Sequence, residues 1–154
     1  MDKNILIEYA DMKEEIKDLR RRIEQNKKEL FRLNGQVVMD SVSCGKKGKK
    51  PLGTVKITGR PVTAISRKES LLNKRIRRLK ELEEGLLELT IQVDEYIETI
   101  EKSELRIIFR LYYIDDLTWY QVALRMNQNF PKRKVKYTED NCRMRHNRFL
   151  EKLE

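Results

Sequence analysis

Apolar residues recur in alternating steps of four and three along the first quarter of the chain. An unbroken pattern of this kind places the side chains on one side of a helix, where they form the seam of a coiled coil. The pattern therefore predicts one long helix of about 30 residues and about 45 Å. Asn26 is the one polar residue in the seam, whose apolar members are Ile5, Tyr9, Met12, Ile16, Leu19, Ile23, Leu30, Leu33 and Val37.

A second run with the same spacing predicts a second long helix. Glu83 and Thr90 interrupt it, while Leu82, Leu87 and Leu89 widen its apolar side. The two helices can pair as an antiparallel hairpin within one chain. The first helix can instead pair with its copy in a parallel dimer, because a seam asparagine fixes register between chains. Both arrangements stay open for this second run, which comprises Leu72, Ile76, Leu79, Leu86, Val93, Ile97 and Ile100.

The segment between these helices is rich in Gly, Ser and Lys. Residues 41–70 carry eight basic side chains and one acidic one. An alternation typical of a strand, Val55 to Thr58 between Gly53 and Gly59, leaves room for a small hairpin. A basic loop favours contact with a phosphate backbone through counterion release, and a solvated loop is the alternative. The candidate phosphate contacts are Lys46, Lys47, Lys49 and Lys50.

From Ser103 the pattern changes to three short helices. We expect Ser103 to cap the first of them, with Glu104 in its first turn. A tight turn at Ile114, Asp115 and Asp116 should end it, because Asp tolerates the left-handed backbone region. The apolar side of this helix is marked by Leu105, Ile108, Phe109 and Tyr112.

The stretch LTWYQVALRM, from Leu117 to Met126, predicts the second short helix. Thr118 is a good N-cap, and Gln121 three residues later completes a capping box. Leu117 and Val122 stand where a hydrophobic staple has its two apolar residues. Ala123 is small enough for another helix to approach closely, which the first helix of a helix-turn-helix requires.

The third short helix should begin near Thr138, with Glu139 and Asp140 in its acidic first turn. Its apolar stripe consists of Cys142, Phe149, Leu150 and Leu153, with His146 near the edge. Arg and Asn side chains read guanine and adenine edges in the major groove, and Arg also binds phosphate. A solvated basic face is the alternative. The candidate DNA-binding residues here are Asn141, Arg143, Arg145, Asn147 and Arg148.

ELRIIFRLYYIDDLTWYQVALRM followed by YTEDNCRMRHNRFLEKL resembles the C-terminal helix-turn-helix of phage-encoded regulators in Gram-positive bacteria. These regulators are similar to region 4 of bacterial sigma factors and to RinA- and ArpU-type late-operon activators. The resemblance covers residues 103–154. It implies sequence-dependent binding of phage DNA and control of a late or structural operon. The residues at the positions of the family pattern are Tyr113, Ile114, Asp115, Leu117, Thr118, Trp119, Val122, Ala123, Met126, His146, Arg148, Leu150 and Leu153.

The sequence departs from that pattern at two places. Asp116 stands where the family usually has Gly. Residues 127–137, NQNFPKRKVKY, lie where the family has a turn of a few residues, and a longer connection alters how a recognition helix is presented. The insertion carries further candidate phosphate contacts, Lys132, Arg133, Lys134 and Lys136.

Composition limits the classes of function. The formal net charge of +9 favours a polyanionic partner. Cys44, Cys142 and His146 lack metal-ligand spacing, and Cys142 reads as a small buried residue on a helix. No catalytic constellation has recognisable spacing, so we expect no enzyme, cofactor or small-molecule substrate. No signal peptide or membrane-spanning apolar run is evident, which favours a cytoplasmic protein.

These patterns predict an all-α protein. We expect a coiled-coil helical hairpin in residues 1–102, with a basic loop at 41–70, followed by a sigma region-4-like helix-turn-helix in residues 103–154. The expected function is that of a transcriptional regulator that binds double-stranded DNA as a homodimer through its long helices. Two alternatives are a protein-interaction module that docks on RNA polymerase or another host or phage protein, and a terminase-small-subunit-like DNA-recognition protein.

Overall fold

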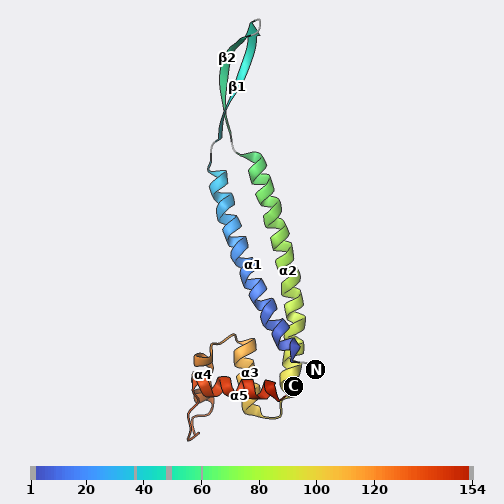
Figure 1. Ribbon diagram of the computed structural model, residues 1–154, viewed down its shortest axis with the longest axis vertical. Coiled ribbons are helices and arrows are strands. Elements are labelled where there is room, and N and C mark those ends of the chain that lie inside the picture. The colour runs from blue at the N-terminus through green and yellow to red at the C-terminus, as the bar shows by residue number, and fades with distance from the viewer. Residues whose placement is uncertain (1–2, 37, 48–49, 60, 153–154) are drawn as a thin grey trace. The chain divides into compact units, whose positions relative to one another are not determined.

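The computed structural model describes residues 3–36, 38–47, 50–59 and 61–152, with the backbone alone between residues 38 and 57. Val37 and Leu153, both predicted on apolar stripes, lie outside the described residues. The all-α class and the long N-terminal helix pair are confirmed (Figure 1). The elements in chain order are α1 (Asn4–Asn34), β1 (Val38–Lys47), β2 (Lys50–Gly59), α2 (Val62–Glu98), α3 (Ser103–Phe109), the π-helix η1 (Arg110–Ile114), α4 (Trp119–Asn129) and α5 (Glu139–Glu151).

Contacts divide the chain into two compact units. One comprises Met1–Glu15 with Leu82–Glu154, and the other comprises Ile16–Glu81. The change of sequence pattern predicted one boundary instead, between residues 102 and 103. Here the first turns of α1 and the last turns of α2 belong with the C-terminal helices.

In the unit Ile16–Glu81, α1 and α2 pair with each other in antiparallel directions. Lys68 Nζ lies 2.5 Å from Glu29 Oε2, and Arg75 donates to the side-chain oxygen of Asn26. Asn26 is buried at 3% exposure. The seam asparagine therefore has its partner on α2 of the same chain, which is the intrachain arrangement. Pairing with a second copy stays a prediction.

A two-stranded antiparallel hairpin joins these helices. The register runs from Val38 opposite Gly59 to Lys47 opposite Lys50, and each strand has ten residues, more than the alternation at Val55–Thr58 indicates. The predicted loop at 41–70 was too long at its C-terminal end, because α2 already begins at Val62. Ile65 N donates to the Pro61 carbonyl at 3.0 Å, and proline suits a helix start because it lacks an amide hydrogen.

The other unit has a core to which both ends of the chain contribute. Leu6, next to the predicted seam residue Ile5, is 1% exposed. This end of α1 shares a core with α3, so more of its surface is buried than pairing with one helix requires. Leu87, expected to widen the apolar side of α2, is instead 67% exposed. The buried members of this core are Leu6, Tyr9, Leu89, Val93, Tyr96, Ile97, Ile100 and Phe109.

A second core lies among the C-terminal helices α3, η1, α4 and α5. The predicted start of α3 was wrong by one residue. Lys102 is the N-cap, while Ser103 is the first helical residue and its hydroxyl accepts from Arg106 Nη2 at 2.9 Å. Asp116 has φ 57°, the left-handed conformation predicted for this turn. The buried members of this core are Ile108, Leu111, Val122, Ala123, Met126, Tyr137 and Cys142.

The starts of α4 and α5 are as predicted. Thr118 N donates to Gln121 Oε1 at 3.0 Å, and Gln121 N donates to Thr118 Oγ1 at 3.4 Å, which is the complete capping box. Thr138 caps α5 by accepting from Asn141 N at 3.3 Å. Each bond satisfies a backbone amide that would otherwise lack an intrahelical partner. In the described part of the chain, the helices all lack the apolar length that crossing a bilayer requires.

Candidate nucleic-acid interface

Helix α5 presents a buried side and an exposed side. Cys142 is fully buried, as predicted, and burial raises the pKa of its thiol, which makes it a packed apolar side chain rather than a nucleophile. Phe149 and Leu150 are partly buried on the same side. Residues two positions apart on an α-helix point to nearly opposite sides. Arg143 and Arg145 therefore lie on opposite flanks of α5 and do not face one groove together.

Arg145 is paired with another helix, although its side chain is 41% exposed. It forms an ion pair with Glu104 of α3, and its guanidinium carbon lies 5.4 Å from the centroid of the Tyr137 ring. The other carboxylate oxygen of Glu104 lies 3.5 Å from Arg133 Nη2, and the Glu104 side chain is 16% exposed. Two of the four arginines predicted to bind DNA are thus paired with one carboxylate, which joins α3, α5 and the loop between α4 and α5.

Only part of the insertion at 127–137 is an irregular loop. Residues 127–129 form the last turn of α4, so the irregular part begins at Phe130. Asn127 Nδ2 donates to the Tyr137 carbonyl at 2.9 Å, and Tyr137 N donates to Asn127 Oδ1 at 2.7 Å. Tyr137 is buried at 5% exposure, and Phe130 packs against the same core. The Asn127 side chain therefore closes the loop at its base, and α4 and α5 remain packed on one core.

The cations of the loop are exposed beyond that closure. Lys132, Lys134 and Lys136 are solvent-accessible, and Lys136 Nζ donates to the Pro131 carbonyl at 3.3 Å. The Arg133 guanidinium carbon lies 5.2 Å from the Phe130 ring centroid. The lysines therefore remain accessible to a phosphate backbone, whereas Arg133 packs against the loop itself.

The other predicted residues of α5 differ in their accessibility. Arg143 is exposed and lies 2.8 Å from Asp140 Oδ1, within the helix. Arg148 and Asn147 are exposed, and Asn147 Oδ1 lies 2.9 Å from His146 Nδ1. Asn141 is half-buried and its side-chain oxygen is inaccessible to solvent, so it is poorly placed to read a base. Besides the paired Arg145, the accessible candidates on α5 are thus Arg143, Asn147 and Arg148.

The structure does not describe the side chains of the lysines predicted to contact phosphate from the segment that joins α1 and α2. The backbone of Lys46 and Lys47 lies in β1, and that of Lys50 lies in β2, but their side chains lie outside the described part. Lys49 lies outside the described residues altogether. These four lysines belong to the unit Ile16–Glu81, whereas the candidates on α5 belong to the other unit.

His146 is a structural residue that the sequence pattern placed only near the edge of the stripe. It is 6% exposed, and its Nε2 lies 2.8 Å from the Tyr113 hydroxyl. In the neutral ring, Nδ1–H donates to Asn147 and Nε2 accepts from Tyr113. Burial lowers the pKa of His146, since it penalises the charged imidazolium. The ring centroid lies 4.9 Å from that of Phe109 and 5.1 Å from that of Trp119, within an aromatic cluster.

The spacing of His146, four residues after Cys142 on the apolar stripe, was the sequence signal for its burial. Among the described residues, no group of three or more His, Cys, Asp or Glu side chains has an arrangement that could hold a metal ion. Comparison with protein-family models, curated proteins and solved structures found no match. The function is therefore inferred from the side chains themselves.

Proposed function

We propose that this protein is a cytoplasmic, non-enzymatic transcriptional regulator that binds double-stranded DNA and controls a phage late or structural operon. One observation carries the proposal. The helices α4 and α5 pack on a common core with capped starts, and the exposed side of α5 carries Arg143, Asn147 and Arg148. Such a pair of helices can place the exposed side of the second in the major groove.

The accessible residues have different roles in this proposal. Arg148 contacts a base edge, because its guanidinium group can make the paired hydrogen bonds that distinguish guanine. Asn147 contacts a base through its Nδ2 group, because its Oδ1 already accepts from His146 Nδ1. Lys132, Lys134 and Lys136 contact phosphates and supply affinity without sequence preference. Arg145 and Arg133 act indirectly, since Glu104 fixes them. A homodimer formed through the long helices would present two copies of α5 to two half-sites.

The test is a binding measurement on the full-length protein by fluorescence anisotropy. Duplexes tiled across the upstream regions of the genome that encodes the chain are compared with a random duplex at several salt concentrations. We expect one region to bind at least about tenfold more tightly than the random duplex, with affinity falling steeply as salt rises. Equal affinity for every region would refute sequence-dependent binding.

Two variants sharpen this test. Arg148→Ala should weaken binding to the preferred duplex by roughly 1–3 kcal/mol if it reads a base. Lys28→Ala removes the same charge from an exposed position on α1 and is the matched control. Equal losses from the two substitutions would show that Arg148 contributes charge alone.

A further inference from the structure

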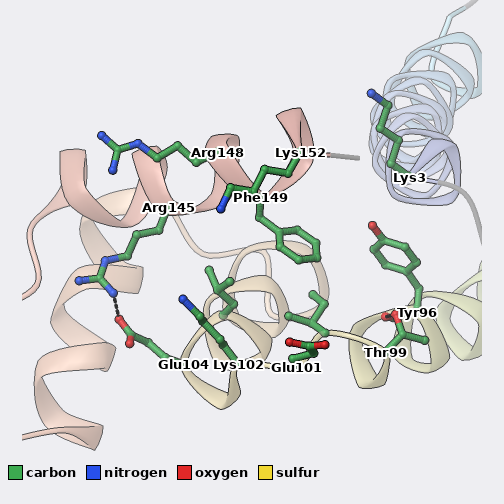
Figure 2. A pocket seen from close by; sticks show the side chains of 12 residues that line it. Lys3, Tyr96, Thr99, Glu101, Lys102, Glu104, Arg145, Arg148, Phe149 and Lys152 are labelled. Atoms are coloured by element: carbon green, nitrogen blue, oxygen red, sulfur yellow. Dashed lines mark hydrogen bonds and ion pairs between the residues drawn. The ribbon is translucent and has the colours of Figure 1, made fainter. Parts of the chain in front are cut away.

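A cleft of about 730 Å³ lies among α2, α3, α5 and the start of the chain, within one compact unit (Figure 2). This volume is in the range that binds ligands. Its lining includes an apolar part and a cationic part. None of the three lysines that line it, Lys3, Lys102 and Lys152, belongs to the predicted DNA-binding set.

The apolar part is centred on Phe149. Figure 2 shows its ring between α5 and Tyr96, in the middle of the residues that line the cleft. Phe149 and Leu105 are each only partly buried, so part of their apolar surface faces this space. Tyr96 and Ile100 are buried at 4% and 2% exposure and also line the cleft. An apolar side chain of a ligand would find a partner surface here.

The cationic part surrounds that surface. In Figure 2, Lys3 and Lys152 lie on different sides of the Phe149 ring, with Lys102, the N-cap of α3, nearby. Lys102 and Lys152 are exposed. Arg148 also lines the cleft but points away from Phe149 in this view, and Arg145 is paired with Glu104. Glu101 lines the cleft as well, so one carboxylate faces the two exposed ammonium groups of Lys102 and Lys152.

Apolar surface next to ammonium groups suits an acidic peptide better than a DNA backbone. A DNA backbone offers phosphates and sugars but no apolar side chain that would occupy the space beside Phe149. An acidic peptide offers both, since its carboxylates match the lysines while an aliphatic or aromatic side chain covers Phe149 and Leu105. We propose that this cleft binds an acidic peptide segment of a partner protein, with one apolar side chain packed on Phe149. This inference does not depend on DNA binding.

The test begins with selection of random dodecapeptides displayed on phage against the full-length protein. We expect the enriched peptides to combine several Asp or Glu residues with an aliphatic or aromatic residue. Synthetic copies of these peptides should bind at least about tenfold more weakly to the variant Lys102→Glu/Lys152→Glu. The matched control, Lys74→Glu/Lys80→Glu, makes the same charge change at exposed positions of α2 and should bind them normally. Thermal unfolding of both variants checks that they are folded.

Three results would overturn the proposal. One is a selection that enriches no peptide, or only peptides without acidic residues. Another is equal peptide binding by the two charge-reversed variants. The third is a loss of duplex DNA affinity in Lys102→Glu/Lys152→Glu with unchanged peptide binding, which would make the cleft a phosphate site. Arg143→Ala separates this proposal from DNA binding, because it should affect duplex binding and leave peptide binding unchanged.

Discussion

Arg145 of α5 forms an ion pair with Glu104 of α3, a partner 41 positions away in the chain. The same carboxylate lies 3.5 Å from Arg133 Nη2. An arginine that the sequence pattern assigned to DNA is therefore paired within the protein. Glu104 limits how far Arg145 and Arg133 can reach toward a polyanion.

Glu104→Gln should increase the affinity of the protein for random duplex DNA. The substitution removes one negative charge and frees two guanidinium groups to pair with phosphates. Each added phosphate contact should steepen the plot of log affinity against log salt concentration by about 0.9. Fluorescence anisotropy across a salt series measures both quantities. Glu84→Gln, at an exposed position of α2, is the charge-matched control, and identical slopes for the two variants would contradict the expectation.

Asn127→Ala should destabilise the C-terminal helices. It removes both hydrogen bonds to the backbone of Tyr137, which is buried at 5% exposure. At about 1 kcal/mol for each bond, the free energy of unfolding should fall by about 2 kcal/mol. Urea denaturation followed by circular dichroism measures this change. Asn129→Ala, an exposed site in the same turn of α4, should have a much smaller effect, and a loss as large as that of Asn127→Ala would argue against the closure.

His146 should make the folded state less stable in mild acid. Burial lowers the pKa of this imidazole below its ordinary value of 6.5, so the unfolded chain takes up a proton more readily than the folded one. The stabilising contribution of the neutral ring is complete above the unfolded pKa and is lost as the pH falls through it toward the lowered folded pKa. The free energy of unfolding should therefore decrease from about pH 7.5 to about pH 5.5.

The comparison for this pH effect is His146→Gln, which removes the only histidine of the sequence. The variant should be less stable at neutral pH, because it disturbs the hydrogen bond to Tyr113, but its stability should change less between the two pH values. Parallel pH profiles for the variant and the natural protein would assign the effect to other groups.

Gly85→Ala should stabilise the protein. Gly85 lies within α2, and a Cβ there would be 3.8 Å from the Met12 Cε and Sδ atoms, an ordinary van der Waals distance. Alanine is favoured over glycine inside a helix by up to about 1 kcal/mol. Thermal unfolding should show a higher midpoint. A lower midpoint would mean that α1 and α2 cannot accommodate the added methyl group.

Local signals predicted the helices well. The capping box at Thr118 and the cap at Thr138 depend on residues three positions apart, so the sequence contains all the information they need. The alternating seam likewise identified both long helices. The residues that sequence reasoning misplaced depend on distant partners. Leu6 is buried because its end of α1 shares a core with Phe109, and no periodicity within α1 reveals that neighbour.

The candidate site was harder to predict for the same reason. Arg133 and Arg145 were chosen as DNA-binding cations and are exposed, but both pair with Glu104, and Glu104 is far from them in the sequence. The eleven-residue insertion gave no sign that Asn127 would close it, because an asparagine that binds a backbone ten residues later has no periodic signature. Residue type identified the candidates, while only the fold showed which of them pair with a distant residue.

The core that joins Leu6 and Tyr9 with Phe109 brings together the two ends of the chain. It has a consequence for how such a protein diversifies. Recombination that exchanged residues 103–154 for those of another protein would place a foreign aromatic surface against Leu6 and Tyr9, which lie far earlier in the sequence. The C-terminal helices therefore cannot be exchanged alone, and the first turns of α1 must be inherited together with them.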